Sequence, residues 1–385
     1  MHTDTHGTLL EDTRFEEFIR RLISYHNNEG VLSVYLNIEP ALATREGYEA
    51  ELISAWKPLK AQKMDQWTRG RLEYEMSGIT EEVRSWREPP GRSVVMFFSG
   101  PGGLRIVLPL HFPVATVAKF ERRPLLRPLI AALDEHHRYC IVMLDKAQAR
   151  LITVLLGSVE EEIHLESDVL PRTDVGGWGG YLQPRYARHR EHHLTEHIHR
   201  VIEHLWTIDR SRPIHSLILS GPDEPISALR RMLPKALARS VVATVHLDLD
   251  LPTPEVVRRV DALDAEGRER EDRALVGELT TNAAKGDHAV LGWDRTLEAL
   301  GEGRVHLLVL AAHEPRTGVQ CAQGHYFTAG DARTCPLCSE PLWHTDDIAE
   351  AAVRGALTTD AQVRFLSSGV GAELGPEGVG AVLRW

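Results

Sequence analysis

Residues 176–205 read GGWGGYLQPRYARHREHHLTEHIHRVIEHL, four glycines around one tryptophan followed by a stretch rich in arginine and histidine. Glycine adopts backbone conformations that other residues avoid, so GGWGG predicts a flexible loop. Behind it, His189, His193 and His197 are spaced by four residues, which places them on one face of a helix. The stretch therefore predicts a loop followed by a long helix over about residues 185–207.

The segments on both sides of this helix alternate between strand and helix patterns. Residues 138–167 predict three strands in a meander, with a turn at Asp145–Ala147. After the helix come a predicted strand at 214–221, a helix at about 225–238 and a strand at 241–250. This alternation is typical of a mixed, largely covered sheet. The strongly charged helix at about 254–282 then predicts a solvated connector into a third domain.

The flanking parts also mix strands and helices. Towards the N-terminus, we predict a strand at 31–40, a helical stretch at about 46–86 interrupted at Pro58, a hairpin at 93–110 and a connection near 120–135. Towards the C-terminus, we predict a helix and a buried strand in 292–313, a helix at 345–357 and a strand at 361–368. The predicted fold class is α/β and α+β, multidomain. Its three domains are an α+β domain at 1–132, an α/β domain at 133–265, and a three-layer α/β unit at 266–385 with a zinc-ribbon-like insertion at 318–345.

Charge and hydropathy limit the partners of the chain. Its 385 residues carry 44 Lys and Arg against 55 Asp and Glu, a net charge of −11. Such a chain has no overall electrostatic attraction to nucleic acid, so we expect any RNA contact to be local and no binding to DNA. No apolar run reaches the ~18 to 20 residues of a membrane span, and the N-terminus lacks signal-peptide character. We therefore expect a cytoplasmic protein without a membrane partner.

Three of the four cysteines cluster near the C-terminus. The pattern Cys321-x3-His325 followed by Cys335-x2-Cys338 places two ligand pairs on two turns, which is typical of zinc bound in a tetrahedron. His325 is the first choice for the fourth ligand and His344 is the alternative. Four protein ligands leave no open position, so this zinc would be structural rather than catalytic. The other interpretation is that these are ordinary buried residues in a reducing compartment.

The helix behind the loop permits three interpretations. In the first, cations follow an RNA phosphate backbone while the loop reaches forward; this candidate RNA-binding set is Gly176, Gly177, Trp178, Arg185, Arg188, His189, Arg190 and His193. In the second, a metal binds His193 and His197, although no acidic residue completes an HExxH-type signature. In the third, the helix simply has a solvated face rich in histidine.

Several separated motifs resemble the archaeo-eukaryotic class-1 peptide release factors and their relative Pelota, especially the divergent bacterial, Balon-like members. RYARHRE at 185–191 is similar to RFARLRE, which follows the Gly-Gly-Gln loop in that family. GWDRTLEALGEGRVHLLVL at 292–310 is similar to GVEDTLKALEMGAVEILIV, and PEGVGAVLRW at 376–385 to GGIGGILRY. Archaeal members also insert a cysteine zinc motif at about the place of Cys321–Cys338. The resemblance covers the second and third predicted domains, whereas the first matches only in the order of its elements.

This resemblance implies a tRNA-shaped protein that enters the ribosomal A site and contacts rRNA. Its first domain would face the decoding centre, and its second would reach the peptidyl-transferase centre and a P-site tRNA. Its third would bind a translational GTPase such as elongation factor Tu. The sequence departs from the family at the loop, because Trp178 stands where release factors carry the glutamine that helps to position the attacking water. It also lacks the Asn-Ile-Lys-Ser sequence associated with stop-codon reading.

Three hypotheses about function follow. The first is a non-catalytic A-site factor of ribosome hibernation or rescue, because an indole cannot hold a water as an amide does. The second is a release or rescue enzyme that hydrolyses peptidyl-tRNA with the altered loop, for which Gly176, Gly177, Trp178 and the displaced Gln183 are the catalytic candidates. The third is a zinc-containing RNA-processing enzyme that uses the histidine-rich helix.

Overall fold

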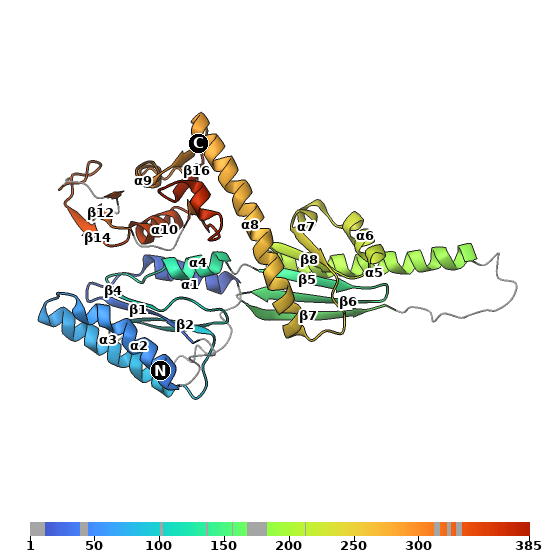
Figure 1. Cartoon of the computed structure of the whole chain (residues 1–385), viewed down its shortest axis with the longest axis horizontal. Helices are drawn as coiled ribbons and strands as arrows, with labels where there is room; N and C mark the ends of the chain where they lie inside the picture. The colour runs from blue at the N-terminus through green and yellow to red at the C-terminus, as the bar shows by residue number, and fades with distance from the viewer. Residues whose placement is uncertain are drawn as a thin grey trace. The chain divides into compact units, whose positions relative to one another are not determined.

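The computed structural model describes residues 12–38, 45–100, 103–135, 138–155, 157–167, 183–211, 213–311, 316–321, 325–328 and 333–385. The chain divides into two compact units (Figure 1). One unit combines Met1–Glu135 with Glu271–Trp385, and the other is His136–Arg270. The predicted first and third domains thus lie within one compact unit, and the three-domain division remains a prediction.

An antiparallel sheet with the order β3-β2-β1-β4 forms the N-terminal part of the first unit. Its strands are β1 (Val31–Asn37), β2 (Ser93–Ser99), β3 (Leu104–Leu110) and β4 (Val117–Glu121). Because side chains alternate along a strand, Leu32, Val34 and Leu36 all face the same core, which α2 (Arg45–Ala61) and α3 (Gln66–Ser85) cover. The predicted hairpin is confirmed as β2 and β3. A Cβ at Gly103 would lie 1.8 Å from the Ser99 carbonyl oxygen, so this turn requires glycine.

Two predictions for this part of the chain are wrong. Pro58 does not interrupt the helical stretch but lies inside α2, where it is exposed and water can hydrate the carbonyl that lacks its donor. The helical stretch is interrupted instead between α2 and α3. There Asp65 caps the N-terminus of α3 by accepting a hydrogen bond from the Thr68 amide at 2.9 Å. The predicted connection near 120–135 contains a mostly buried helix, α4 (Arg127–Glu135). A further helix, α1 (Asp12–Ser24), precedes the sheet.

The C-terminal part of the first unit holds a mixed sheet with the order β10-β16-β11-β15. Its strands are β10 (Ala289–Leu291), β11 (Val305–Leu310), β15 (Gln362–Phe365) and β16 (Val379–Leu383), and its helices are α9 (Trp293–Gly301), α10 (Ile348–Thr358) and the 3-10 helix η2 (Gly371–Leu374). A separate sheet, β13-β12-β14, is made of β12 (Gly318–Cys321), β13 (Tyr326–Thr328) and β14 (Leu342–Thr345). We call this three-stranded sheet the ribbon; it occupies the predicted insertion.

The second unit is built on a mixed sheet, as the sequence predicts, and its strand order is β7-β6-β5-β8-β9. The strands are β5 (Tyr139–Leu144), β6 (Gln148–Leu155), β7 (Ser158–Glu166), β8 (Ser216–Ser220) and β9 (Val241–Val245). The meander β5-β6-β7 is antiparallel, whereas β5, β8 and β9 run parallel. The helices α5 (Gln183–Ser211), α6 (Asp223–Met232) and α7 (Lys235–Arg239) pack their apolar residues into the core on one face of the sheet.

The long helix α8 (Thr253–Lys285) is not the solvated connector that its charges suggest. Val256 and Val260 are fully buried in the core of the second unit, and Val276 and Leu279 belong to a core of the first. Asp272 is buried as well and accepts hydrogen bonds from the Arg364 guanidinium at 2.8 Å and the Ser367 amide at 2.9 Å. One face of α8 thus packs into the two cores, and a buried charge on that face is paired, while many of its other charged residues are exposed. None of the described helices is long and apolar enough to cross a membrane.

Candidate functional site

The predicted cysteine cluster forms a compact set of ligand atoms in the ribbon. Cys321 ends β12, His325 precedes β13, and Cys335 and Cys338 lie on the turn before β14. The His325 Nδ1 lies 3.4 Å from the Sγ atoms of both Cys321 and Cys335, and the Sγ atoms of Cys321 and Cys338 are 3.6 Å apart. All four ligand atoms lie within 4.8 Å of one another. A tetrahedral site with metal–ligand bonds of about 2.0 to 2.3 Å has edges of roughly 3.5 to 3.8 Å, so these residues can hold a metal ion.

Backbone hydrogen bonds hold both turns of this cluster. The Cys321 amide donates to the His325 carbonyl at 3.0 Å, which closes the first turn. In the second, the Cys335 amide donates to the Glu340 carbonyl at 2.7 Å, and Ser339 takes a left-handed conformation with a φ of 62°. The alternative ligand, His344, is an exposed residue of β14 paired with Val319, outside the cluster. Four protein ligands leave no open coordination position, which argues against metal catalysis at this site.

The structure does not describe the glycine loop. Gly176, Gly177 and Trp178 lie outside the described residues. Gln183 is the first residue of α5, and Arg185, Arg188, His189 and Arg190 follow in its first two turns, but only the backbone of these five residues is described. His193 is half-buried, and beyond it Ile198, Val201 and Leu205 bury the helix against the sheet. The proposed RNA-binding set therefore remains a prediction.

His197 has a structural environment that the sequence does not reveal. Its side chain is fully buried, and its Nδ1 lies 2.7 Å from the Ser167 hydroxyl, at the end of β7. Arg200 donates to the same hydroxyl and, at 2.8 Å, to the Glu166 carbonyl. The Ser167 hydroxyl can accept from Arg200 and donate its own proton to Nδ1, an arrangement that suits a neutral His197. Among the described residues, His193 and His197 do not belong to any group of three or more ligand side chains that could hold a metal ion.

The pKa of His197 is lowered, chiefly by burial and further by Arg200, while a backbone contact at Gln148 and Asp145 act in the opposite direction. A folded-state pKa below the unfolded value means that stability is fully present above about pH 6.5 and is lost as the pH falls through that value. We expect urea unfolding to show a smaller decrease in stability between pH 7.5 and 5.5 for His197→Leu than for the wild type. His199→Leu, at an exposed position of the same helix, should retain the wild-type decrease. An equal decrease in all three proteins would contradict the assignment.

A basic, aromatic surface that was not predicted from the sequence lies where α2 turns into α3. Lys57, Lys60, Lys63 and Trp67 are all exposed there, and Trp67 exposes 57% of its surface. Arg69 donates to the carbonyls of Lys60 and Gln62 at 3.5 and 3.3 Å, so it caps the end of α2. We call these four exposed residues the basic tip. Its signal in the sequence was the lysine spacing of three residues before the Asp65 cap, followed by a tryptophan in the first turn.

Exposed tryptophan and lysine side chains within one short segment are typical of surfaces that bind single-stranded RNA. An indole offers a stacking surface for unpaired bases, and lysines neutralise phosphates. The α2–α3 turn is rigid because both helix ends are capped, so these side chains are presented without an ordering cost for the backbone. In a chain with a net charge of −11, such a tip is the local basic surface that RNA binding requires.

Part of the chain matches a protein-family model, and several solved structures of translation factors are similar to the chain. Residues 124–265 match the model of the bacterial archaeo-eukaryotic release factor family 10. No curated protein sequence matches the chain significantly. Similar solved structures include an archaeal translation termination factor, aRF1, with 14% identity over 98% of this chain and 99% of that one at a TM-score of 0.27. Another is S. cerevisiae Dom34, a translation termination-like factor, with 11% identity over 93% and 95% of the two chains at a TM-score of 0.43.

A third similar structure is archaeal Pelota in a model of ribosome-bound Pelota and ABCE1, with 12% identity over 96% of this chain and 94% of that one at a TM-score of 0.40. The matched residues 124–265 include the loop and the helix from which the resemblance was first inferred. The central part of the chain, residues 124–265, is therefore similar to the bacterial archaeo-eukaryotic release factor family 10.

Proposed function

We propose that this protein binds the ribosomal A site during hibernation or rescue and does not hydrolyse peptidyl-tRNA. The observation that carries the proposal is Trp178, which follows Gly176 and Gly177 within the family-matched residues 124–265. An amide both donates and accepts hydrogen bonds and can orient a water, whereas an indole offers one N–H donor and no acceptor. The same indole is well suited to stack on an unpaired base or on the terminal adenosine of a tRNA.

The basic tip supports a contact between the N-terminal part and ribosomal RNA. In this proposal the N-terminal domain faces the decoding centre, and Lys57, Lys60 and Lys63 lie among phosphates there. No Asn-Ile-Lys-Ser sequence is present, so we propose that stop codons are not read. The central domain would bring its glycine loop and the first turns of α5 to the peptidyl-transferase centre, near a P-site tRNA.

For the C-terminal domain we propose a structural zinc and a translational GTPase partner. Three thiolates and one imidazole form a typical zinc ligand set, and Cys321, His325, Cys335 and Cys338 have suitable spacing. Without the ion, negatively charged thiolates this close would repel one another. The GTPase, such as elongation factor Tu, would bind the C-terminal domain and deliver the protein to the ribosome.

Competition for the A site tests this function. Ribosomes with a deacylated tRNA in the P site would be incubated with the protein and then challenged with labelled aminoacyl-tRNA. We expect the protein to sediment with the ribosomes and to reduce A-site tRNA binding in proportion to its own occupancy. Sedimentation without competition would place the protein elsewhere on the ribosome, and no sedimentation would exclude ribosome binding under these conditions.

A further inference from the structure

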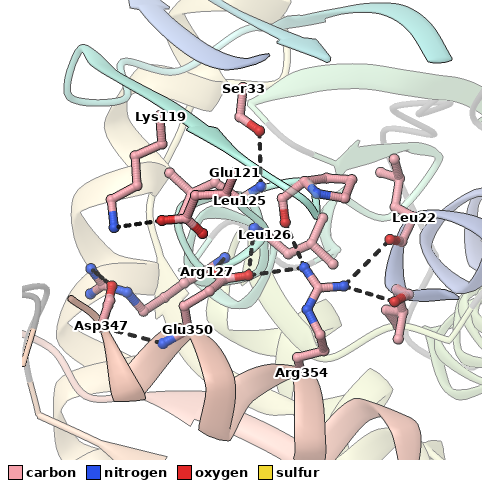
Figure 2. Close-up of polar contacts among 12 residues, drawn as sticks. Leu22, Ser33, Lys119, Glu121, Leu125, Leu126, Arg127, Asp347, Glu350 and Arg354 are labelled. Carbon is pink, nitrogen blue, oxygen red and sulfur yellow. Dashed lines mark hydrogen bonds and ion pairs between the residues drawn. The ribbon is translucent and has the colours of Figure 1, made fainter. Parts of the chain in front are cut away.

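Three consecutive residues of the first unit are held from two sides. The Leu125 amide donates to the Ser33 hydroxyl at 2.9 Å, and the Tyr35 hydroxyl donates to the Leu125 carbonyl at 2.7 Å. Ser33 and Tyr35 belong to β1, and both are buried. These two bonds fix Leu125 to the N-terminal sheet, and Figure 2 shows the one to Ser33.

The next two residues are held by the C-terminal part of the chain. The Leu126 and Arg127 amides donate to the two carboxylate oxygens of Glu350, at 3.0 and 2.6 Å. Glu350 lies on α10, and its carboxylate faces the first amides of α4, where the helix dipole favours a negative charge. Leu125 and Leu126 are adjacent, so no flexible segment separates the bonds to the N-terminal sheet from the bonds to Glu350.

One helical turn after Glu350, Arg354 extends the same contact. Its guanidinium donates to Glu350 at 3.1 Å, to the Pro124 carbonyl at 2.5 Å and to the Ile23 carbonyl at 2.7 Å. The Ile23 carbonyl is in the last turn of α1, where a cation is electrostatically favoured. Figure 2 shows the guanidinium between Glu350 and Leu22, whose carbonyl also accepts from it at 3.5 Å. Glu350 and Arg354 expose only 9% and 5% of their surfaces.

The far end of α4 is attached to the C-terminal part as well. Asp134 accepts a hydrogen bond from the Phe365 amide of β15 at 2.8 Å. At the near end, Arg127 pairs with Asp347 at 2.9 Å, and Asp347 in turn caps α10 through the Ala349 amide. α4 is therefore bonded at both ends to residues from the last fifty positions of the chain, while Leu125 is bonded to the N-terminal sheet.

We propose that Glu350 and Arg354 form a clasp that joins the N-terminal sheet and the C-terminal α/β sheet into one rigid body. Separating the two parts would break the buried, charge-assisted hydrogen bonds of Glu350 to the Leu126 and Arg127 amides and of Arg354 to the Pro124 and Ile23 carbonyls, which costs more than breaking one exposed ion pair. A partner that binds the C-terminal part and moves it must then move the N-terminal part with it. This inference rests on contacts inside the first unit and is independent of the proposed ribosomal function.

Distance measurements between spin labels test the clasp directly. Non-canonical amino acids would carry the labels at the exposed positions Glu73 on α3 and Arg295 on α9 of the full chain. We expect the wild type to give one narrow distance distribution, and Arg354→Met to broaden it at least about twofold. Arg105→Met removes an exposed ion pair with Glu82 inside the N-terminal part and should leave the distribution unchanged.

Hydrogen exchange supplies a second measurement. In Glu350→Gln, which preserves side-chain size, we expect the Leu126 and Arg127 amides to exchange on the order of 10- to 100-fold faster than in the wild type. A broad wild-type distribution would overturn the proposal even if a variant failed to fold. It would also be overturned by an Arg354→Met distribution as narrow as that of the wild type, or by unchanged exchange of the two amides.

Discussion

Replacing Cys335 with serine should release the metal from the protein and unfold the ribbon. The ribbon strands are only four, three and four residues long, so they bury too little apolar surface to fold without a crosslink. A structural zinc supplies a binding free energy of about 10 to 16 kcal/mol in small zinc-binding peptides, and much of that energy drives folding. We expect one metal ion per wild-type chain and none in Cys335→Ser, together with loss of the dispersed NMR signals of β12–β14.

The matched control is the alternative ligand. His344→Ala should retain one metal ion and the folded ribbon, because His344 lies outside the cluster. His325→Ala should lose the metal or weaken its binding strongly. Elemental analysis after dialysis against a chelator provides the measurement. A wild-type protein without bound metal, or a Cys335→Ser protein that keeps it, would contradict the assignment of the ligands.

Reversing the charge of the basic tip should have the largest effect on ribosome binding. If Lys57, Lys60 and Lys63 each neutralise one phosphate, the triple change to glutamate removes three contacts. Each contact contributes about 0.7 to 0.9 to the slope of log affinity against log salt. We therefore expect the affinity to fall on the order of 100-fold at about 0.1 M salt and the slope to decrease by about 2, as measured by sedimentation at several salt concentrations.

A second triple variant controls for net charge. Lys146, Lys235 and Lys285 are exposed lysines elsewhere in the chain, and their replacement by glutamate changes the net charge equally. We expect this variant to bind ribosomes nearly as the wild type does. Trp67→Ala should weaken binding by about 1 to 3 kcal/mol, the value of a base stacked on an aromatic side chain, with an unchanged salt slope. Equal losses in both triple variants would show that the basic tip has no specific role.

The parts of the fold that the sequence predicts are those with local periodicity. The meander β5-β6-β7 and the helix α5 follow from apolar patterns within single segments. In contrast, α4 was taken for a connection because its boundaries depend on Glu350 and Asp134, whose contacts lie more than 200 positions away along the chain. The charges of α8 suggest a solvated helix because the partners of Asp272 lie more than 90 positions away in the sequence. Contacts of this kind arise only in the tertiary structure.

The candidate site follows the same division. Spacing alone identified Cys321, His325, Cys335 and Cys338, because two tight turns suffice to bring these ligands together. Spacing also suggested His193 and His197 as a metal pair, but helical periodicity cannot distinguish an exposed face from one that packs on a sheet. The basic tip was not predicted because its residues come from α2, from the connection after it and from α3, so no single helical periodicity joins them.

The most direct test of the central claim is a peptide-release measurement on ribosomes that have bound this protein. Ribosomes with a labelled peptidyl-tRNA in the P site would be saturated with the protein, pelleted to confirm occupancy, and followed for release of the labelled peptide. If Trp178 abolishes hydrolysis, the protein sediments with the ribosomes and release stays at the rate without protein. Release above that rate, abolished by Gly177→Ala, would contradict this account and identify a peptidyl-tRNA hydrolase.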